Sequence, residues 1–459
     1  MSFAHGFGEQ LDLEIPLWLW LGGAALTVLL SFAVVIDFLP KRMESRRVIE
    51  VEISSWWLFR FLLHPKILWI LRLVVLTIIF LTVASGLFGN QDAQQNLAPT
   101  MVWITFWVGV TFAVVLFGNL WHLLNPFATL YLLIFGQRRA VVSDTVLIPA
   151  WPLLVLFVGF MFAEHLWSSA DVPRSLALLI FLYSGLTIAA MHRFGAANWL
   201  REGEIFSVLF SVFSRFSPLK LTLATEGTAK AYLRPPAIAL VEHETSSAGL
   251  TLFIVMALAS VTFDGWIETT LWQEFLFNAS LHFGIDKGLG VVGFLINSAA
   301  LLLFPTFFVA VFWLACRATM SLSKGRITIN AWQLMRRYAT SLIPIAIAYH
   351  FAHYAILFLV DGQALFYLAS DPFGWGWNLF GTANFEINKE IISTNAIWYF
   401  VVTLIVIGHM LSVYLSHVVT LSLTQQKSVA VRAGAPILFL MVFYTVLSLW
   451  VIAQPALAT

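Results

Sequence analysis

Ten apolar runs, each long enough or nearly long enough to cross a lipid bilayer, divide this chain of 459 residues. A spanning helix needs about 20 mainly apolar residues, because each residue adds about 1.5 Å and the hydrocarbon core is about 30 Å thick. A helix also satisfies its own backbone hydrogen bonds, which lipid cannot do. The sequence therefore predicts an all-α, polytopic transmembrane helical bundle with about ten spans, at residues 16–39, 67–89, 101–119, 149–167, 173–191, 247–265, 289–316, 341–360, 396–423 and 436–453.

The positively charged residues indicate the direction in which these runs cross the membrane. All but four of the 25 Lys and Arg residues lie in the loops after the first, third, fifth, seventh and ninth runs. The exceptions are Arg174, Lys287 and Lys389 in the opposite loops and Arg72 inside the second run. Cytoplasmic loops carry an excess of Lys and Arg, so we expect both termini on the non-cytoplasmic side, N-out and C-out.

Composition supports a membrane protein and excludes other classes. The chain is 60% hydrophobic and only 11% charged, so the lipid bilayer is its main expected partner. The net charge is +1 and no basic cluster alternates with aromatic residues, which argues against a nucleic-acid partner. The single cysteine, Cys316, cannot form an intrachain disulfide or a thiolate cluster, so any metal would need His or carboxylate ligands.

Two further apolar segments do not fit the pattern of full spans. Residues 119–135 are interrupted by Asn125-Pro126, and residues 205–216 are too short. We expect each to lie along the cytoplasmic interface or to re-enter the bundle. The largest loop on that side, at about 192–246, is too short and irregular for a globular unit, so residues 1–459 are expected to form one integral membrane domain.

Four histidines lie inside the eighth and ninth runs. His350 and His353 are three residues apart, and His409 and His417 are eight apart, so each pair falls on approximately one helical face. Ionisable side chains are costly inside a bilayer and are therefore functional candidates. Imidazole is a ligand for zinc, copper and iron, so these residues predict a divalent-metal or haem site, for which two levels of paired histidines are easier to build than one four-ligand site. Alternatively, each imidazole only donates a hydrogen bond to a neighbouring helix.

A second candidate set lies towards the non-cytoplasmic ends of helices. The fourth run ends in Glu164-His165, the sixth ends at Asp264, and Asp361 follows the eighth. Carboxylates beside imidazoles can bind hard cations, orient histidine and accept protons from water, which suits a hydrolytic metal site or a general acid/base pair. The alternative is ordinary solvation at helix ends, with Asp-Gly turns. Glu164 is the one carboxylate that we expect to be buried, because its neighbours are apolar.

Sequence motifs along nearly the whole chain carry a family resemblance. They are AHGFGEQLDLEIPLWLWLGGAALTVLLSF, GNLWHLLNPFATL, ANWLREGEIFSVLFSVFSRFSP, VTFDGW, HFAHYAILFLVDGQ, SDPFGWGWNLFGTA, GHMLSVYLSH and YTVLSLWVIAQP. Together these segments resemble a bacterial membrane-protein family labelled fenitrothion hydrolase. The resemblance implies an organophosphorus hydrolase in the bacterial inner membrane that acts on a small apolar ester, together with a second membrane or periplasmic subunit. In such an enzyme, a metal-activated or base-activated water would attack phosphorus and an aryl oxide would depart.

Three other functions remain open from the residues alone. Paired histidines could hold haem or copper in a redox or metal-handling protein, which an absorption band near the Soret region would reveal for haem. The intramembrane histidines and Glu164 could instead form the ion path of a proton-coupled transporter. A scaffolding subunit is the third alternative, and it predicts that His353→Ala and His409→Ala leave any associated activity unchanged.

Overall fold

The protein folds as a helical membrane bundle, as the apolar runs predict. The computed structural model describes residues 15–38, 50–136, 148–223, 229–241, 246–282 and 290–454. Within these ranges, nine helical segments are long and apolar enough to span a bilayer. Their bounds are α1 (Leu17–Phe38), α3 (Pro65–Phe88), the continuous α4 (Leu97–Pro99), η2 (Thr100–Val110) and α5 (Thr111–Phe117), α9 (Pro173–Phe194), α12 (Ala248–Ile267), α14 (Gly290–Leu322), the continuous α15 (Ala331–Tyr338), η4 (Ala339–Leu342) and α16 (Ile343–Leu359), α18 (Thr394–Thr424) and α19 (Lys427–Ile452).

The fourth expected run differs from the other nine. It corresponds to α8 (Trp151–His165), whose 15 residues extend only about 22 Å along the helix axis. Helix α8 ends at His165, before the polar segment that leads to α9. Shorter elements complete the described helices: α2 (Trp57–Leu62), η1 (Ala93–Gln95), α6 (Leu120–Leu124), α7 (Pro126–Phe135), α10 (Ala196–Glu202), α11 (Ile205–Phe213), η3 (Ile238–Leu240), α13 (Thr270–His282), η5 (Asp361–Ala364) and α17 (Leu365–Ser370).

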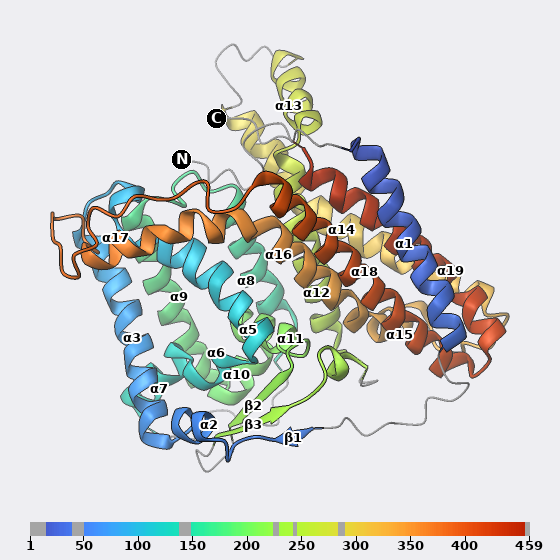
Figure 1. The fold of residues 1–459 in the computed structure, drawn as a ribbon, viewed down its shortest axis with the longest axis horizontal. Coiled ribbons are helices and arrows are strands. Elements are labelled where there is room, and N and C mark those ends of the chain that lie inside the picture. The colour runs from blue at the N-terminus through green and yellow to red at the C-terminus, as the bar shows by residue number, and fades with distance from the viewer. Residues whose placement is uncertain are drawn as a thin grey trace.

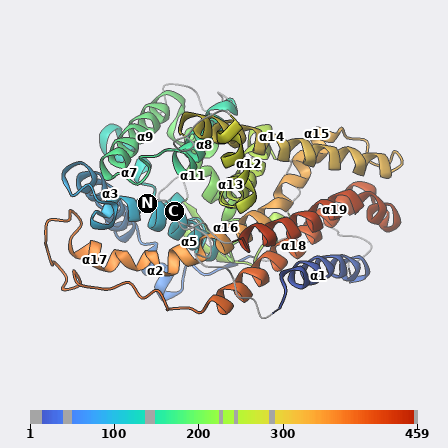
Figure 2. The same ribbon diagram turned by 90° about the horizontal axis from the view of Figure 1, so that it is seen from above.

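The spans form two groups with central helices between them (Figures 1 and 2). Helices α3, α7 and α9 contact one another on one side, whereas α1, α14, α18 and α19 pack together on the other. Helix α12 contacts α8, α14 and α16, and α16 packs along α18. Most of α12 and α16 is therefore buried in protein, whereas the outer helices present much of their surface to lipid.

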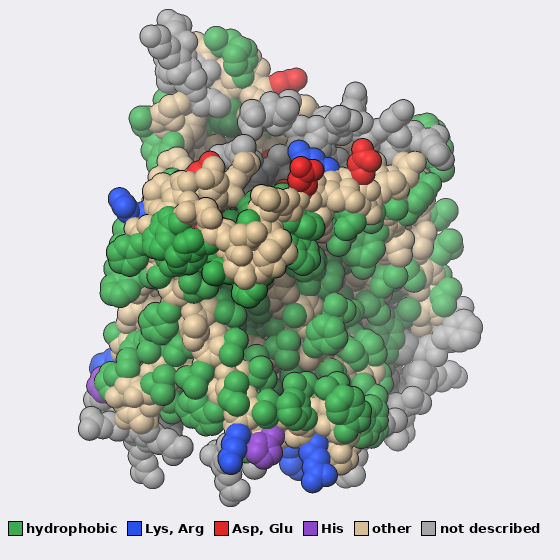
Figure 3. Space-filling model, turned by 60° about the vertical axis from the view of Figure 1, so that its left-hand side comes forward, with side chains coloured by type: hydrophobic (Ala, Val, Ile, Leu, Met, Phe, Trp, Pro, Cys, Tyr) green, Lys and Arg blue, Asp and Glu red, His purple; other side chains and the backbone are tan. Residues whose placement is uncertain are grey.

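The outer surface has the charge distribution of a membrane-spanning protein. Figure 3 shows hydrophobic side chains across the middle of the molecule, with Lys, Arg and His along the lower edge, and with Asp and Glu beside some Lys or Arg along the upper edge. A small antiparallel sheet lies at the lower side (Figure 1), with strand order β1 (Val51–Glu52), β3 (Ala229–Leu233) and β2 (Leu219–Leu223). Ion pairs Lys220–Glu50 and Lys230–Glu52 join residues far apart in the sequence.

The interrupted segment at 119–135 forms two short helices. Asn125 separates α6 from α7 and caps α7 by accepting a hydrogen bond from the backbone N–H of Ala128 at 3.0 Å. Pro126 occupies the first turn of α7, where its missing N–H costs nothing. The break therefore comes from the Asn-Pro pair on which the expectation rested.

The short segment at 205–216 re-enters the bundle. Helix α11 is buried along almost its whole length and contacts α5, α8 and α16. Its first turn is capped by Glu204, which is fully buried and accepts hydrogen bonds from the backbone N–H groups of Phe206 and Ser207 and from the hydroxyl of Tyr183. A re-entrant helix fills the space under the central spans, near α16.

Candidate functional site

The structure brings the carboxylate set and one of the intramembrane histidines into a single site. Glu164 and His165 come from the last turn of α8, Asp264 from the last turns of α12, and His353 and Tyr354 from the middle of α16. We call these five residues the polar cluster. Because α12 packs against both α8 and α16, its aspartate lies between the side chains of the other two helices.

Asp264 has partners at both carboxylate oxygens. Its Oδ2 lies 2.8 Å from Nε2 of His353 and 3.1 Å from the hydroxyl of Tyr354. Its Oδ1 lies 3.2 Å from Nδ1 of His165. A carboxylate only accepts hydrogen bonds, so an imidazole nitrogen that faces it is best placed to donate when it carries a proton. Asp264 therefore fixes the orientation of two imidazole rings from two different helices.

Glu164 joins the same network through Tyr354. The tyrosine hydroxyl lies 2.7 Å from Oε1 of Glu164 and 3.1 Å from Oδ2 of Asp264. One hydroxyl proton cannot be donated fully to both carboxylates, and the shorter contact places it on Glu164, because Asp264 also faces two imidazole nitrogens. The other oxygen of Glu164, Oε2, has no hydrogen-bond partner among the described residues, and Nε2 of His165 lies 3.6 Å from it.

The polar cluster is enclosed by apolar and aromatic side chains. The side chains of Glu164 and His165 are 5% and 1% exposed. The rings of Trp107 and Tyr354 lie 6.5 Å apart, and Tyr349 stacks on His353 at 6.1 Å. With little water nearby, electrostatic interactions inside this site are stronger than at a protein surface.

A glycine permits the close packing of helices at this site. Gly265 follows Asp264 in α12, and a Cβ there would lie 2.6 Å from Cγ1 of Val451 and 3.2 Å from the hydroxyl of Tyr349. Small residues let transmembrane backbones approach closely. Gly265 therefore allows α19 and α16 to pack beside the aspartate.

Three members of the cluster have the geometry expected of metal ligands. One ligand atom from each of Glu164, His165 and Asp264 can be chosen so that all lie within 4.8 Å of one another. Two carboxylate oxygens and one imidazole nitrogen are a mixed donor set that suits zinc, iron or manganese. No other group of three His, Cys, Asp or Glu side chains meets this criterion in the described part of the chain.

The structure does not bring the four intramembrane histidines together. His353 belongs to the polar cluster, whereas His350 is buried with its ring edge-on to Trp107 at 5.1 Å. His409 lies with Nδ1 2.7 Å from the carbonyl oxygen of Ile405 in its own helix. His417 packs against Phe32 of α1 at 5.3 Å. The metal or haem role of these four remains a prediction, and only His353 lies beside carboxylates.

Asp361 lies apart from the other candidate catalytic residues. It begins η5, seven residues beyond Tyr354 and therefore about 10 Å further along the direction of α16. Its side chain is half-buried, and burial raises the pKa of this carboxyl while nearby Lys389 lowers it. The structure thus joins Glu164, His165 and Asp264 but not Asp361.

Sequence reasoning missed two residues that matter here. Tyr354 connects both carboxylates, yet a tyrosine does not stand out in an apolar run as an intramembrane His or Glu does. Its position directly after His353 was the available signal. Glu204 was not among the candidate residues, yet it caps α11 from a fully buried position.

Comparison with known proteins identifies no relative of this chain. No protein-family model, no curated protein and no solved structure matches the chain. The functional conclusion therefore rests on the residues of the site and on the resemblance between sequence motifs.

Proposed function

We propose that this protein is a bacterial inner-membrane hydrolase that cleaves neutral, apolar esters, including organophosphorus esters, at the polar cluster. The observation that carries the proposal is the convergence of Glu164, His165 and Asp264 within 4.8 Å inside a multi-pass membrane protein. Buried carboxylates and imidazoles at one site are costly to maintain in a bilayer, and such groups mark functional sites more often than structural ones. The family resemblance supplies the ester class.

The polar cluster is suited to hold a divalent cation and to handle a proton. Glu164, His165 and Asp264 would bind the cation, which when bound would supply Lewis-acid polarisation of the ester and lower the pKa of water. We assign the proton of the attacking water to Oε2 of Glu164, because that oxygen has no donor among the described residues. His353 and Tyr354 hold the two carboxylates in place.

The reaction would replace one ester bond with a bond to water oxygen. The water oxygen attacks phosphorus, the bond from phosphorus to the aryl oxygen breaks, and the aryl oxide leaves with the electron pair. Glu164 takes one proton from the water, and the aryl oxide is protonated in solution or by the cluster. The apolar surroundings of the site exclude bulk water, which strengthens the interactions that favour this charge movement.

Proton-coupled transport is the second candidate. It is favoured by the continuous sequence of hydrogen-bond contacts from Glu164 through Tyr354 and Asp264 to His353. Chains of carboxylates and imidazoles across several helices form proton paths in membrane proteins. This candidate requires no bound metal, whereas the hydrolase proposal does.

Metal content and hydrolysis test the proposal together. We would purify the chain in detergent, determine zinc, iron, manganese and copper by plasma mass spectrometry, and follow nitrophenol release from fenitrothion in proteoliposomes. We expect near-stoichiometric metal that falls at least fivefold in Glu164→Gln and Asp264→Asn, with loss of hydrolysis. His417→Ala is the matched control, since His417 is intramembrane but packs against Phe32 away from carboxylates.

The outcomes separate the candidate functions. Metal that is lost in His417→Ala but kept in Asp264→Asn would move the metal centre to the histidines of the ninth run and reject the polar cluster. A metal-free wild type without hydrolysis would overturn the hydrolase proposal. Proton uptake that depends on Glu164 in such metal-free proteoliposomes would then support transport.

A further inference from the structure

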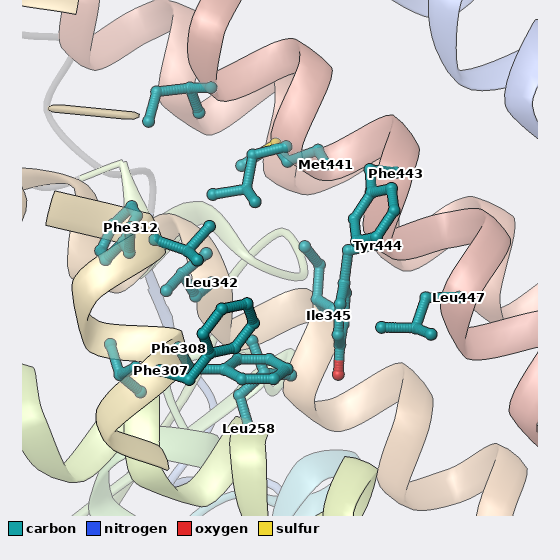
Figure 4. Close-up of a pocket in the computed structure, with 14 residues that line it drawn as sticks. Leu258, Phe307, Phe308, Phe312, Leu342, Ile345, Met441, Phe443, Tyr444 and Leu447 are labelled. Atoms are coloured by element: carbon teal, nitrogen blue, oxygen red, sulfur yellow. The ribbon is translucent and has the colours of Figure 1, made fainter. Parts of the chain in front are cut away.

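An apolar pocket lies between the helices that surround the polar cluster on the α19 side. Figure 4 shows Leu258 of α12, Phe308 and Phe312 of α14, and Ile345 of α16 pointing into it, opposite Met441 of α19. The cavity has a volume of about 80 Å³, and every lining residue is apolar or aromatic. Tyr444 carries the one hydroxyl among the lining residues, and that hydroxyl is bonded to Thr262.

The mouth of the pocket faces the hydrocarbon core of the bilayer. Phe307 of α14 and Phe443 of α19 line the pocket and are 63% and 56% exposed. Phe307 lies 15 residues from the nearer end of α14, and Phe443 lies nine residues from the nearer end of α19. At 1.5 Å per residue these depths are about 22 and 14 Å, so the opening meets acyl chains instead of water.

A proline lies close to the α14 side of the pocket. Pro305 lies within α14, where it removes a backbone hydrogen bond and typically bends the helix. The α14 residues that line the pocket begin two residues later, at Phe307. The α14 side of the pocket therefore begins just after the residue that interrupts the backbone hydrogen bonds of this helix.

The inner wall of the pocket leads to the polar cluster. The ring of Tyr444 lies 6.5 Å from the ring of Tyr349, which in turn stacks on His353 at 6.1 Å. The hydroxyl of Tyr349 is buried without a hydrogen-bond partner among the described residues. Two tyrosine rings thus separate an apolar space that opens to lipid from the imidazole that is bonded to Asp264.

We propose that this pocket receives the apolar portion of a neutral ester dissolved in the bilayer, and that Tyr444 separates it from the polar cluster. The inference rests on the proposed hydrolase function for the fate of the ester group. The all-apolar lining favours hydrocarbon or aryl groups, and it excludes an anionic headgroup, which would lose its hydration without gaining a partner. Rotation of Tyr444 would break its bond to Thr262 and open the space towards Tyr349.

Photolabelling in proteoliposomes tests the pocket without requiring turnover. The probe is a methyl ester of a fatty acid that carries a diazirine on its chain, and labelled peptides are mapped by mass spectrometry. Leu447→Trp fills the rim of the pocket at a half-buried position. Phe439→Trp is the matched control, because Phe439 is on the same helix and 74% exposed but does not line the pocket.

We expect label on Phe308, Met441 and their neighbours in the wild type, reduced at least fivefold by Leu447→Trp and unchanged by Phe439→Trp. Equal loss in both variants, or label spread evenly over the lipid-facing helices, would overturn the inference. A phospholipid with the same diazirine on its acyl chain should label Phe439 and leave the pocket unlabelled. If this phospholipid labels the pocket as strongly as the ester probe does, the pocket is a structural lipid site, and the proposal that it receives an ester is rejected.

The two proposals fail in different ways. Pocket labelling that is intact in metal-free or Asp264→Asn protein, together with absent hydrolysis, would reject the hydrolase and keep the binding site. Hydrolysis that proceeds with an unchanged KM in Leu447→Trp would reject the pocket and keep the hydrolase. If both proposals hold, Leu447→Trp raises the KM for fenitrothion at least fivefold. The same variant changes kcat little, because Leu447 lines the pocket and lies outside the polar cluster.

Discussion

Nε2 of His353 lies 2.8 Å from Oδ2 of Asp264, across the contact between α16 and α12. Both side chains are buried, at 4% and 6% exposure. This contact joins a histidine from the middle of one helix to a carboxylate near the end of another. Each of the two side chains thus has a partner from a different helix.

Replacement of Asp264 by asparagine is expected to destabilise the fold as well as the site. Asparagine keeps the size but places an NH₂ group where an imidazole or the Tyr354 hydroxyl needs an acceptor. Removal of one partner of a buried ionic network costs about 3 kcal/mol. The midpoint of thermal unfolding in detergent should therefore fall in Asp264→Asn but not in the exposed control Glu390→Gln. Equal midpoints for the two variants would show that the contacts of Asp264 contribute no net stability.

Loss of the Tyr354 hydroxyl is expected to uncouple the two carboxylates. Tyr354→Phe keeps the ring in place but leaves Oε1 of Glu164 without its donor. An unsatisfied buried acceptor costs about 1–3 kcal/mol, and we also expect at least a tenfold fall in kcat. Tyr399→Phe, at a position 48% exposed on α18, is the control for loss of a hydroxyl. Wild-type kcat in Tyr354→Phe would exclude a role for this hydroxyl in the reaction.

Gly408 is expected to tolerate no side chain. A Cβ there would lie 2.5 Å from Cβ of Ala348 and 2.8 Å from the carbonyl oxygen of Pro344. The backbone of α16 cannot yield cheaply, so Gly408→Ala should separate α18 from α16 and cost about 1–3 kcal/mol. Gly159→Ala is the matched control, because a Cβ there meets nothing within 4 Å and should stabilise α8 by up to about 1 kcal/mol. Thermal unfolding of both variants measures the difference, and a Gly408→Ala midpoint at or above that of the wild type would contradict the close approach.

Asp361 is expected to make the free energy of unfolding depend on pH, from acidic to neutral pH. Burial raises the pKa of this carboxyl in the folded protein above its unfolded value, so the folded state holds the proton more tightly. The resulting stability is fully present below the unfolded pKa and is lost as pH rises through the folded pKa. Asp361→Asn cannot ionise, so its unfolding midpoint relative to the wild type should rise from acidic to neutral pH, by on the order of 1 °C. A constant difference across this range would show that the two states have the same pKa.

The fold could be predicted further than the site. Runs of apolar residues determine where helices cross a bilayer, because lipid leaves few other options for the backbone. The fourth run was counted as a full span because apolar residues flank it on both sides, whereas helix α8 itself has only 15 residues and ends at His165. The small sheet was also missed, because β1 has only two residues and Val51 in it pairs with Leu233 of β3, far away in the sequence.

Within the site, burial could be predicted but partners could not. Glu164 was expected inside the protein from its apolar neighbours, and its side chain is buried. The meeting of His353 with Asp264 depends on how α12 rotates against α16, which helical spacing does not determine. His409 satisfied the same sequence criterion as His353, yet its Nδ1 faces a carbonyl of its own helix. Spacing identifies a face, and only packing identifies what that face meets.

The three-stranded sheet has a consequence for how the protein is made. Ala231 of β3 forms hydrogen bonds with Ser54, which precedes it by 177 residues and lies two residues after β1. At synthesis rates of about 5–20 residues per second, roughly 10–35 s separate the emergence of these two residues from the ribosome. The first strand must therefore wait without its partner while several helices enter the membrane. The sheet can close only when that part of the bundle is already in place, which makes it a late step of assembly.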